Sequence, residues 1–274
     1  MIPFFKMSGS GNDFILIDNL DGSLPIGDLA AFAKSICTRK ISVGADGLIV
    51  LEPSERADFR WQFYNADGSV AEMCGNGGRC AARYAFLRGI APARMTFETL
   101  AGIIDAEVEG ETVKLRLTDP GEANLGLRVD VNGRVLELDS IDTGVPHAVR
   151  FVQDFREVDI FSDGRAIRRH AHFQPAGTNV NFVRAVDRHA LQVRTYERGV
   201  EDETLACGTG SVASVLIASA RNFVDSPVAV TVRSGEVLTI FFEKTKTGFA
   251  GIYLEGGTKV VYQGSLWEEA YRIG

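Results

Sequence analysis

The chain has 274 residues, 45% of them hydrophobic and 24% charged, which is enough for one large or two small hydrophobic cores. The net charge is −7 and Lys and Arg are scattered along the sequence, so we expect no nucleic-acid partner. No apolar stretch approaches the roughly 18 residues of a membrane helix. The N-terminus lacks the pattern of a secretion signal. We therefore expect a cytoplasmic protein with no membrane partner.

Strand-like runs separated by turn residues dominate the chain, and four helical patterns interrupt them. The helical patterns are 27–39, 76–88, a weaker one at 154–162, and 209–222. The expected strands of the first half are 2–7, 14–18, 47–51, 59–65, 95–99, 103–108 and 112–118. Those of the second half are 128–131, 134–139, 146–152, 179–186, 190–196, 227–232, 236–242, 249–254 and 258–262. Residues 213–220 are apolar nearly all round, which is typical of a fully buried helix.

Two cysteine-glycine turns with similar flanks lie about half the chain length apart. Each has a tyrosine upstream, then Cys-Gly-x-Gly at Cys74 or Cys207, and then a helical pattern. This repeat predicts an α/β fold, of the α+β-like kind, with two pseudo-symmetric halves. Each half is expected to be a curved, mainly antiparallel sheet around a central helix.

A turn at 119–122 gives the expected boundary between the halves. We expect an N-terminal half at 1–118, which carries Cys74, and a C-terminal half at 119–264, which carries Cys207. Residues 265–274 are expected to pack back on the first half.

The position of each cysteine at a helix start suits acid–base chemistry on a carboxylate substrate. Backbone N–H groups at a helix start lack intrahelical partners, and the helix dipole adds positive potential there. The same field lowers a thiol pKa from its usual value of about 8.5. Cys74 and Cys207 could then act as one thiolate and one thiol, which remove a proton from one face of a carbon and return it on the other.

Cofactor and metal sites are not expected. Cys74 and Cys80 are six residues apart and no Cys-x-x-Cys pair occurs, so the spacing does not fit zinc. Residues 208–213 match the dinucleotide pattern G-x-G-x-x-A, but we expect no βαβ unit around them. No lysine in a recognisable pyridoxal-phosphate setting is visible. Cys37 and Cys80 are expected to be small buried hydrophobes.

The two turns and four further segments resemble the diaminopimelate epimerase family. The segments are 6–14, 44–47, 65–79, 144–147, 177–182 and 196–210. The resemblance implies a cofactor-independent enzyme that interconverts LL- and meso-diaminopimelate for lysine and peptidoglycan precursor synthesis. It also implies a homodimer, formed through the strand around Tyr262.

The resemblance assigns roles to individual residues. Cys74 and Cys207 match the family's catalytic base and acid. Two supporting residues and the substrate contacts also match; the supporting residues are His147 and Glu197, and the contacts are Asn12, Asn65, Gly75, Asn76, Asn179, Glu197, Arg198, Gly208 and Thr209. Two positions depart from many relatives: Val145 stands where Asn is common, and Gly47 where some members have Gln.

Two other functions remain open at this stage. One is a racemase of proline, hydroxyproline or histidine on the same fold. The Glu197-Arg198 pair and the three asparagines instead favour a substrate with an amino acid at both ends. The other is a catalytically silent amino-acid-binding protein, which would not need both cysteines.

Overall fold

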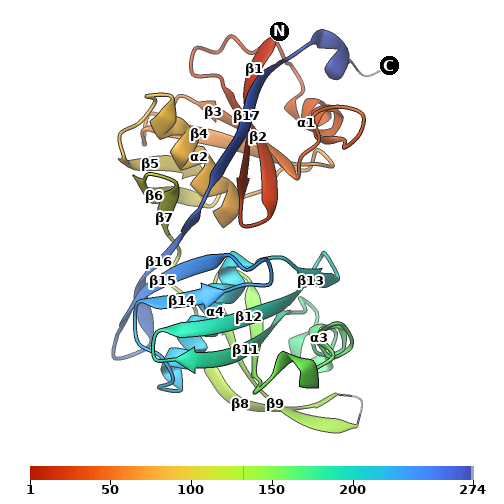
Figure 1. The fold of residues 1–274 in the computed structure, drawn as a ribbon, viewed down its shortest axis with the longest axis vertical. Helices are drawn as coiled ribbons and strands as arrows, with labels where there is room; N and C mark the ends of the chain where they lie inside the picture. Colours follow the sequence, from red (N-terminus) through yellow and green to blue (C-terminus); the bar gives the residue numbers. More distant parts are fainter. Residues whose placement is uncertain (132, 273–274) are drawn as a thin grey trace. The chain divides into compact units, whose positions relative to one another are not determined.

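The computed structural model describes residues 1–131 and 133–272 and divides the chain into two compact units (Figure 1). The first unit comprises residues 1–115 and 256–274, and the second residues 116–255. The expected boundaries were 118 and 264. The later one differs because strand β17 (Lys259–Leu266) pairs with β1 (Ile2–Gly9) in the first unit. Of the segment 265–274, residues 273 and 274 lie outside the described residues.

The described part of the first unit forms a mixed sheet in the order β17-β1-β2-β3-β4-β5-β6-β7. Helix α1 (Leu29–Cys37) connects the parallel strands β2 and β3, and helix α2 (Gly75–Leu87) connects the parallel strands β4 and β5. The remaining strand bounds are β2 (Asn12–Asp18), β3 (Gly47–Glu52), β4 (Phe59–Asn65), β5 (Arg94–Thr99), β6 (Gly102–Glu109) and β7 (Thr112–Arg116).

The described part of the second unit has the order β8-β9-β10-β11-β12-β14-β15-β16, and short β13 also pairs with β12. Helix α3 (Ile160–Arg168) connects parallel β10 and β11, and helix α4 (Gly208–Ala220) lies between parallel β12 and β14. The strand bounds are β8 (Asn124–Val131), β9 (Arg134–Asp142), β10 (Pro146–Phe151), β11 (Asn179–Asp187), β12 (Ala190–Glu197), β13 (Asp202–Thr204), β14 (Val228–Thr231), β15 (Val237–Lys244) and β16 (Phe249–Gly257).

The two units repeat one topology. In the orders given above, both sheets show the same succession of pairings: antiparallel, antiparallel, parallel, antiparallel, parallel, antiparallel, antiparallel. Helices bridge the parallel pairs because parallel neighbours need a crossover connection. The expected fold class, two related halves of mainly antiparallel sheet with few helices, is confirmed.

Three local expectations differ from the structure. The helical pattern at 154–162 is a short 3-10 turn at Phe155–Glu157 followed by α3, because Asp159 accepts a hydrogen bond from Ser162 N and caps a helix that starts at Ile160. Strand β13 was not predicted. The crossover β12–α4–β14 is a βαβ connection around Gly208, where none was expected.

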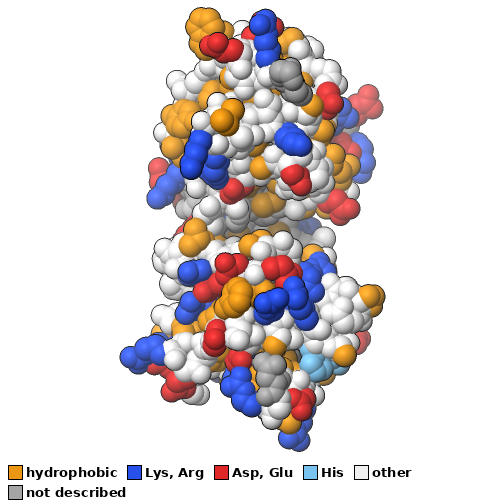
Figure 2. Space-filling model, turned by 90° about the vertical axis from the view of Figure 1, so that its right-hand side faces the viewer, with side chains coloured by type: hydrophobic (Ala, Val, Ile, Leu, Met, Phe, Trp, Pro, Cys, Tyr) orange, Lys and Arg blue, Asp and Glu red, His pale blue; other side chains and the backbone are white. Residues whose placement is uncertain are grey.

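The surface carries charges of both signs. Figure 2 shows Lys and Arg side chains interspersed with Asp and Glu, and neither sign covers a continuous area of the face drawn. Among the described residues, no helix combines the length and apolar character that crossing a membrane requires.

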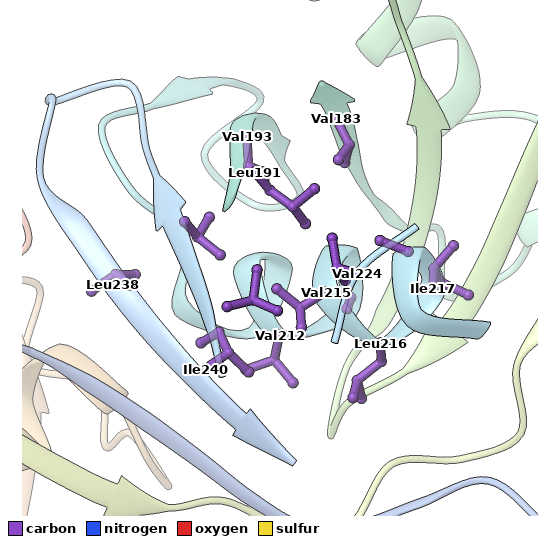
Figure 3. Close-up of a cluster of buried hydrophobic side chains, with 14 of the residues drawn as sticks. Val183, Leu191, Val193, Val212, Val215, Leu216, Ile217, Val224, Leu238 and Ile240 are labelled. Atoms are coloured by element: carbon purple, nitrogen blue, oxygen red, sulfur yellow. The ribbon is translucent and has the colours of Figure 1, made fainter. Parts of the chain in front are cut away.

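Helix α4 forms the centre of the second unit's core, as its apolar pattern predicts. Residues Gly210–Ser219 of this helix are all buried. Its aliphatic side chains pack against those of β11, β12 and β15 (Figure 3). The hydroxyls of Ser211 and Ser214 donate to the carbonyls of Cys207 and Gly210, so these polar groups are satisfied within the helix. The body of α4, from Gly210 onward, is thus fixed by packing in the core.

Candidate active site

Each Cys-Gly turn places its cysteine at the N-cap of a central helix. Cys74 precedes α2 with φ −143° and ψ 119°, and Cys207 precedes α4 with φ −128° and ψ 112°. Their carbonyls accept the first helical hydrogen bonds, from Gly78 N at 2.8 Å and Ser211 N at 2.9 Å. The two cysteines therefore occupy equivalent positions in the two units.

These two helix starts differ from the other two in how they are capped. Asp28 accepts from Ala31 N to cap α1, and Asp159 caps α3 in the same way. In the described structure neither Cys74 nor Cys207 makes a side-chain capping hydrogen bond. The first-turn N–H groups of α2 and α4 are therefore available to an anionic ligand, in the positive end of each helix dipole.

The glycines of the two turns have different tasks. A Cβ at Gly75 would meet nothing within 4 Å, and one at Gly208 would meet only Leu254 Cδ1 at 3.3 Å. A Cβ at Gly77 or Gly78 would come within 3.2 and 3.0 Å of core side chains. The glycine directly after each cysteine thus leaves the backbone accessible, while the later ones allow close packing.

A chain of hydrogen bonds joins the first turn of α2 to the β1–β2 hairpin. The buried Arg79 donates to Asn76 Oδ1 at 2.9 Å and to Ser10 Oγ at the hairpin tip. Asn76 Nδ2 donates to Asn12 Oδ1 at 2.8 Å, and Asn12 Nδ2 donates to Asp46 Oδ2 at 2.9 Å. Along this chain each hydrogen bond is donated in the direction from the Arg79 guanidinium to the Asp46 carboxylate. This direction fixes which amide atom of Asn76 and of Asn12 is oxygen and which is nitrogen. The predicted contacts Asn12 and Asn76 are therefore brought together.

An ionic cluster anchors the carboxylate end of this chain. Arg39 bridges the carboxylates of Asp13 and Asp46. Lys6, which is nearly fully buried, lies 2.9 Å from Asp13 and also donates to the Gly44 carbonyl. Burial raises the pKa of Asp13, but hydrogen bonds from Arg39 and Lys6 outweigh it and the pKa is lowered. Asp13 is thus ionised at neutral pH, and its contacts with Lys6 and Arg39 hold the Asn12 end of β2 in place.

Asn65 lies apart from this chain. It is exposed at the end of β4, and its Nδ2 donates to Ser69 Oγ at 3.0 Å within the following turn. Opposite it on β3 is Gly47, where a Cβ would fall 2.6 Å from the Phe63 ring. Phe63 thus fills the space that a larger side chain at position 47 would need.

In the second unit, the predicted contacts lie on one row of strand ends. His147 pairs with Asn179 across β10 and β11, and Glu197 ends the neighbouring β12. Asn179 Oδ1 accepts from Arg198 N at 2.9 Å, and the Arg198 guanidinium donates to the Ala176 carbonyl at 2.9 Å. The structure therefore gathers these four predicted residues.

Two groups of this row have shifted pKa values. Burial raises the pKa of Glu197 above its usual value. Burial lowers the pKa of His147 to about 3, and the nearby Arg198 charge acts in the same direction. His147 is therefore neutral at physiological pH.

Cys207 lies next to polar groups of its own unit. Its Sγ is 3.6 Å from Thr209 Oγ1, and the Thr209 carbonyl accepts from Thr143 Oγ1 at 3.2 Å. A Cβ at Gly210 would lie 3.1 Å from Cys207 Sγ and 2.4 Å from Asn181 Oδ1. The amide of Asn181 is therefore packed directly against the first turn of α4.

The buried polar residues that hold the predicted site residues in place were not themselves predicted. Arg79 and Asn181 each lie within a predicted element, at positions where the sequence shows a polar residue in an otherwise apolar stretch. That pattern was the available signal, because a buried polar residue needs partners. Within residues 1–131 and 133–272, no cluster of His, Cys, Asp or Glu forms a candidate metal site.

Comparison with solved structures defines the class of fold. A Bacillus anthracis phenazine biosynthesis protein of the PhzF family matches with a TM-score of 0.75 at 17% identity, over 97% of this chain and 99% of that one. A probable proline racemase from Agrobacterium radiobacter K84 matches with a TM-score of 0.69 at 16% identity, over 100% and 96% of the two chains. The chain has the two-unit fold that these proteins share.

Sequence comparison defines the family within that fold. The sequence pattern of the family described as diaminopimelate epimerase matches residues 4–125 and 140–261. A relative named diaminopimelate epimerase, from Aquifex aeolicus (strain VF5), is 46% identical over 279 residues, covering 98% of this chain and 99% of the relative. The chain belongs to the diaminopimelate epimerase family.

Proposed function

We propose that the protein interconverts LL- and meso-diaminopimelate by proton transfer at the α-carbon, without a cofactor. The observation that carries the proposal is the pair of cysteines, each of which is the N-cap of a central helix and, in the described structure, makes no capping hydrogen bond with its own side chain. Membership of the family supplies the substrate class. The step supports lysine and peptidoglycan precursor synthesis.

The two helix starts supply electrostatic stabilisation. The reacting carboxylate accepts hydrogen bonds from the first-turn N–H groups that follow Cys74 and Cys207, where Gly75 and Gly208 leave the backbone open. Negative charge that develops on the carboxylate during deprotonation is stabilised by the same donors. One cysteine thiolate takes the α-proton and the other thiol delivers a proton to the opposite face, so the centre is inverted.

The remaining contacts select a substrate with an amino acid at both ends. Arg198 holds the distal carboxylate, since a planar guanidinium suits a carboxylate in two-point contact. Asn12, Asn65 and Asn179 supply amide hydrogen bonds. Glu197 accepts from an ammonium group of the substrate, and His147 supports the site as a neutral group.

Exchange of the α-proton in deuterated water tests this function. LL-diaminopimelate should gain one α-deuterium and equilibrate with the meso form, whereas proline, hydroxyproline and histidine should not exchange. Cys74→Ala and Cys207→Ala should each lower turnover by about 10²–10⁴-fold while remaining folded, and Cys37→Ala serves as the matched control. Binding without exchange would indicate a silent binding protein. A folded Cys74 or Cys207 variant with more than about a tenth of wild-type turnover would refute the two-thiol mechanism.

We also infer a homodimer formed through β17. Residues 259–263 of this strand are exposed on both faces, and they include Val261 at 57% and Tyr262 at 45% exposure. Exposed backbone groups and apolar side chains at the edge of a sheet form a template with which another chain can pair. Sedimentation of wild type beside Tyr262→Ala tests the inference, and a monomeric wild type would refute it.

We place the enzyme in the cytoplasm, because both reacting cysteines must stay reduced.

A further inference from the structure

A buried carboxamide lies behind the row of predicted contacts in the second unit. Asn181, on β11, is 0% exposed and makes three side-chain hydrogen bonds. Its Nδ2 lies 3.1 Å from His147 Nδ1 and donates to the Ala148 carbonyl at 3.1 Å. Its Oδ1 accepts from Thr195 Oγ1 at 2.9 Å. No role has been assigned to this residue so far.

These partners settle which way the amide points. A backbone carbonyl only accepts, so the group that faces Ala148 must be the NH2 of Asn181. The Thr195 hydroxyl can then donate to the carbonyl oxygen on the other side. Both N–H bonds of the amide are thus committed, one to Ala148 and one to His147.

The orientation of the amide fixes the tautomer of the histidine. Because Nδ1 of His147 faces a donor, it must be the unprotonated nitrogen, and the proton of the neutral ring lies on Nε2. This assignment follows from the hydrogen-bond network. In the described structure Nε2 is buried and has no hydrogen-bond partner. A buried N–H without an acceptor is unfavourable, so Nε2–H is suited to a ligand that accepts a hydrogen bond.

The same amide limits the side-chain size that the first turn of α4 can accommodate. Its Oδ1 occupies the space that a Cβ at Gly210 would need, at 2.4 Å, and that Cβ position is also 3.1 Å from Cys207 Sγ. Asn181 therefore contacts both the supporting histidine and the helix turn that carries the thiol.

We propose that Asn181 is a positioning residue, which holds His147 as an Nε2–H hydrogen-bond donor and seats the first turn of α4 below Cys207. Its catalytic consequence rests on the proposed function. In this arrangement His147 donates a hydrogen bond to a substrate carboxylate or a thiolate, and it does not accept the α-proton.

Nitrogen NMR of the histidine rings in the wild-type protein tests the tautomer directly. The chain has four histidines, so His147 is assigned as the signal missing from His147→Gln. Its Nδ1 should resonate as an unprotonated ring nitrogen and its Nε2 as a protonated one, at a pH where the ring is neutral. His189 is an internal control of opposite sense, because its Nδ1 lies 3.0 Å from the carbonyls of Asp225 and Pro227 and must carry the proton.

Substitutions at the network test the catalytic consequence. Asn181→Leu removes both donors at similar volume and should lower kcat by about 10–100-fold with little change in KM, the range found for groups that orient a metal-bound histidine. Thr195→Val removes only the bond that steadies the amide and should lower kcat less. It also provides a test if Asn181→Leu does not fold.

A protonated Nδ1 on His147 in the wild type would overturn the proposal. Wild-type kcat in a folded Asn181→Leu would also overturn it, as would wild-type kcat in Thr195→Val if Asn181→Leu does not fold. If the wild type does not exchange the α-proton of diaminopimelate at all, the proposed function fails. The ring-nitrogen spectrum then still decides the tautomer.

Discussion

Replacement of Gly210 by alanine tests how tightly the first turn of α4 is fixed. The new Cβ would lie 2.4 Å from Asn181 Oδ1 and 3.1 Å from Cys207 Sγ, whereas real Cβ contacts are essentially never below 3.0 Å. Asn181 is fully buried and bonded on both sides, so it has little freedom to retreat. The helix turn must therefore move instead.

The cost follows from two opposing terms. Overpacking of a core costs about 1–3 kcal/mol, while alanine in place of glycine within a helix returns about 1 kcal/mol. We expect the free energy of unfolding to fall by up to about 2 kcal/mol. The turnover rate should fall more than the stability does, because a shift of about 1 Å at a reacting group lowers the rate on the order of 10²-fold.

The assay pairs α-proton exchange with urea unfolding. Gly27→Ala is the matched control, since a Cβ at Gly27 meets nothing within 4 Å. In an Asn181→Ala background the clash is gone, so the stability cost of Gly210→Ala should shrink and the two costs should not add. Wild-type activity in Gly210→Ala, or strictly additive stability losses, would refute the reasoning.

Substitutions at three further residues probe other parts of the site. Arg79→Met should lower the free energy of unfolding by about 3 kcal/mol or more, because two charge-assisted hydrogen bonds are lost. Arg79→Lys should recover only part of the lost stability. Urea unfolding of both variants measures the two free energies. Arg198→Lys should raise KM for diaminopimelate. The wild type should turn over lysine at least about 10³-fold less efficiently than diaminopimelate, measured as kcat/KM. A kcat/KM for lysine equal to that for diaminopimelate would refute the distal-carboxylate role of Arg198. Because the pKa of folded His147 is about 3 and that of the unfolded group about 6.5, its contribution to stability is full above pH 6.5 and declines as the pH falls toward 3. His147→Gln should therefore flatten the fall in unfolding free energy by about 0.7 kcal/mol per pH unit at pH 6.5, rising to about 1.4 kcal/mol per pH unit at pH 5. An unchanged slope would contradict the buried neutral state.

Local patterns were sufficient to predict the elements that carry the cysteines. The apolar run at 213–220 predicted a buried helix, and residues Gly210–Ser219 of α4 are buried. The two Cys-Gly turns predicted helix starts, and each cysteine is an N-cap. These features follow from periodicity within one element and need no knowledge of partners.

Long-range side-chain pairs could not be predicted in this way. Arg79 bonds to Ser10, 69 residues away, and Asn181 bonds to His147, 34 residues away. Such pairs depend on strand register and on how a helix seats against a hairpin, and neither is encoded in a local pattern. The end of the second unit was misplaced for the same reason, because only pairing with β1 reveals where β17 belongs.

The position of β17 also sets the order in which the chain can mature during synthesis. The second unit is one continuous stretch, residues 116–255, so all of it has been made before β17 appears. The first unit includes β1 near residue 1, yet the strand that pairs with β1 is translated only after the whole second unit. The unit that is started first is therefore completed last, and until then the edge of β1 is open to pairing with other chains.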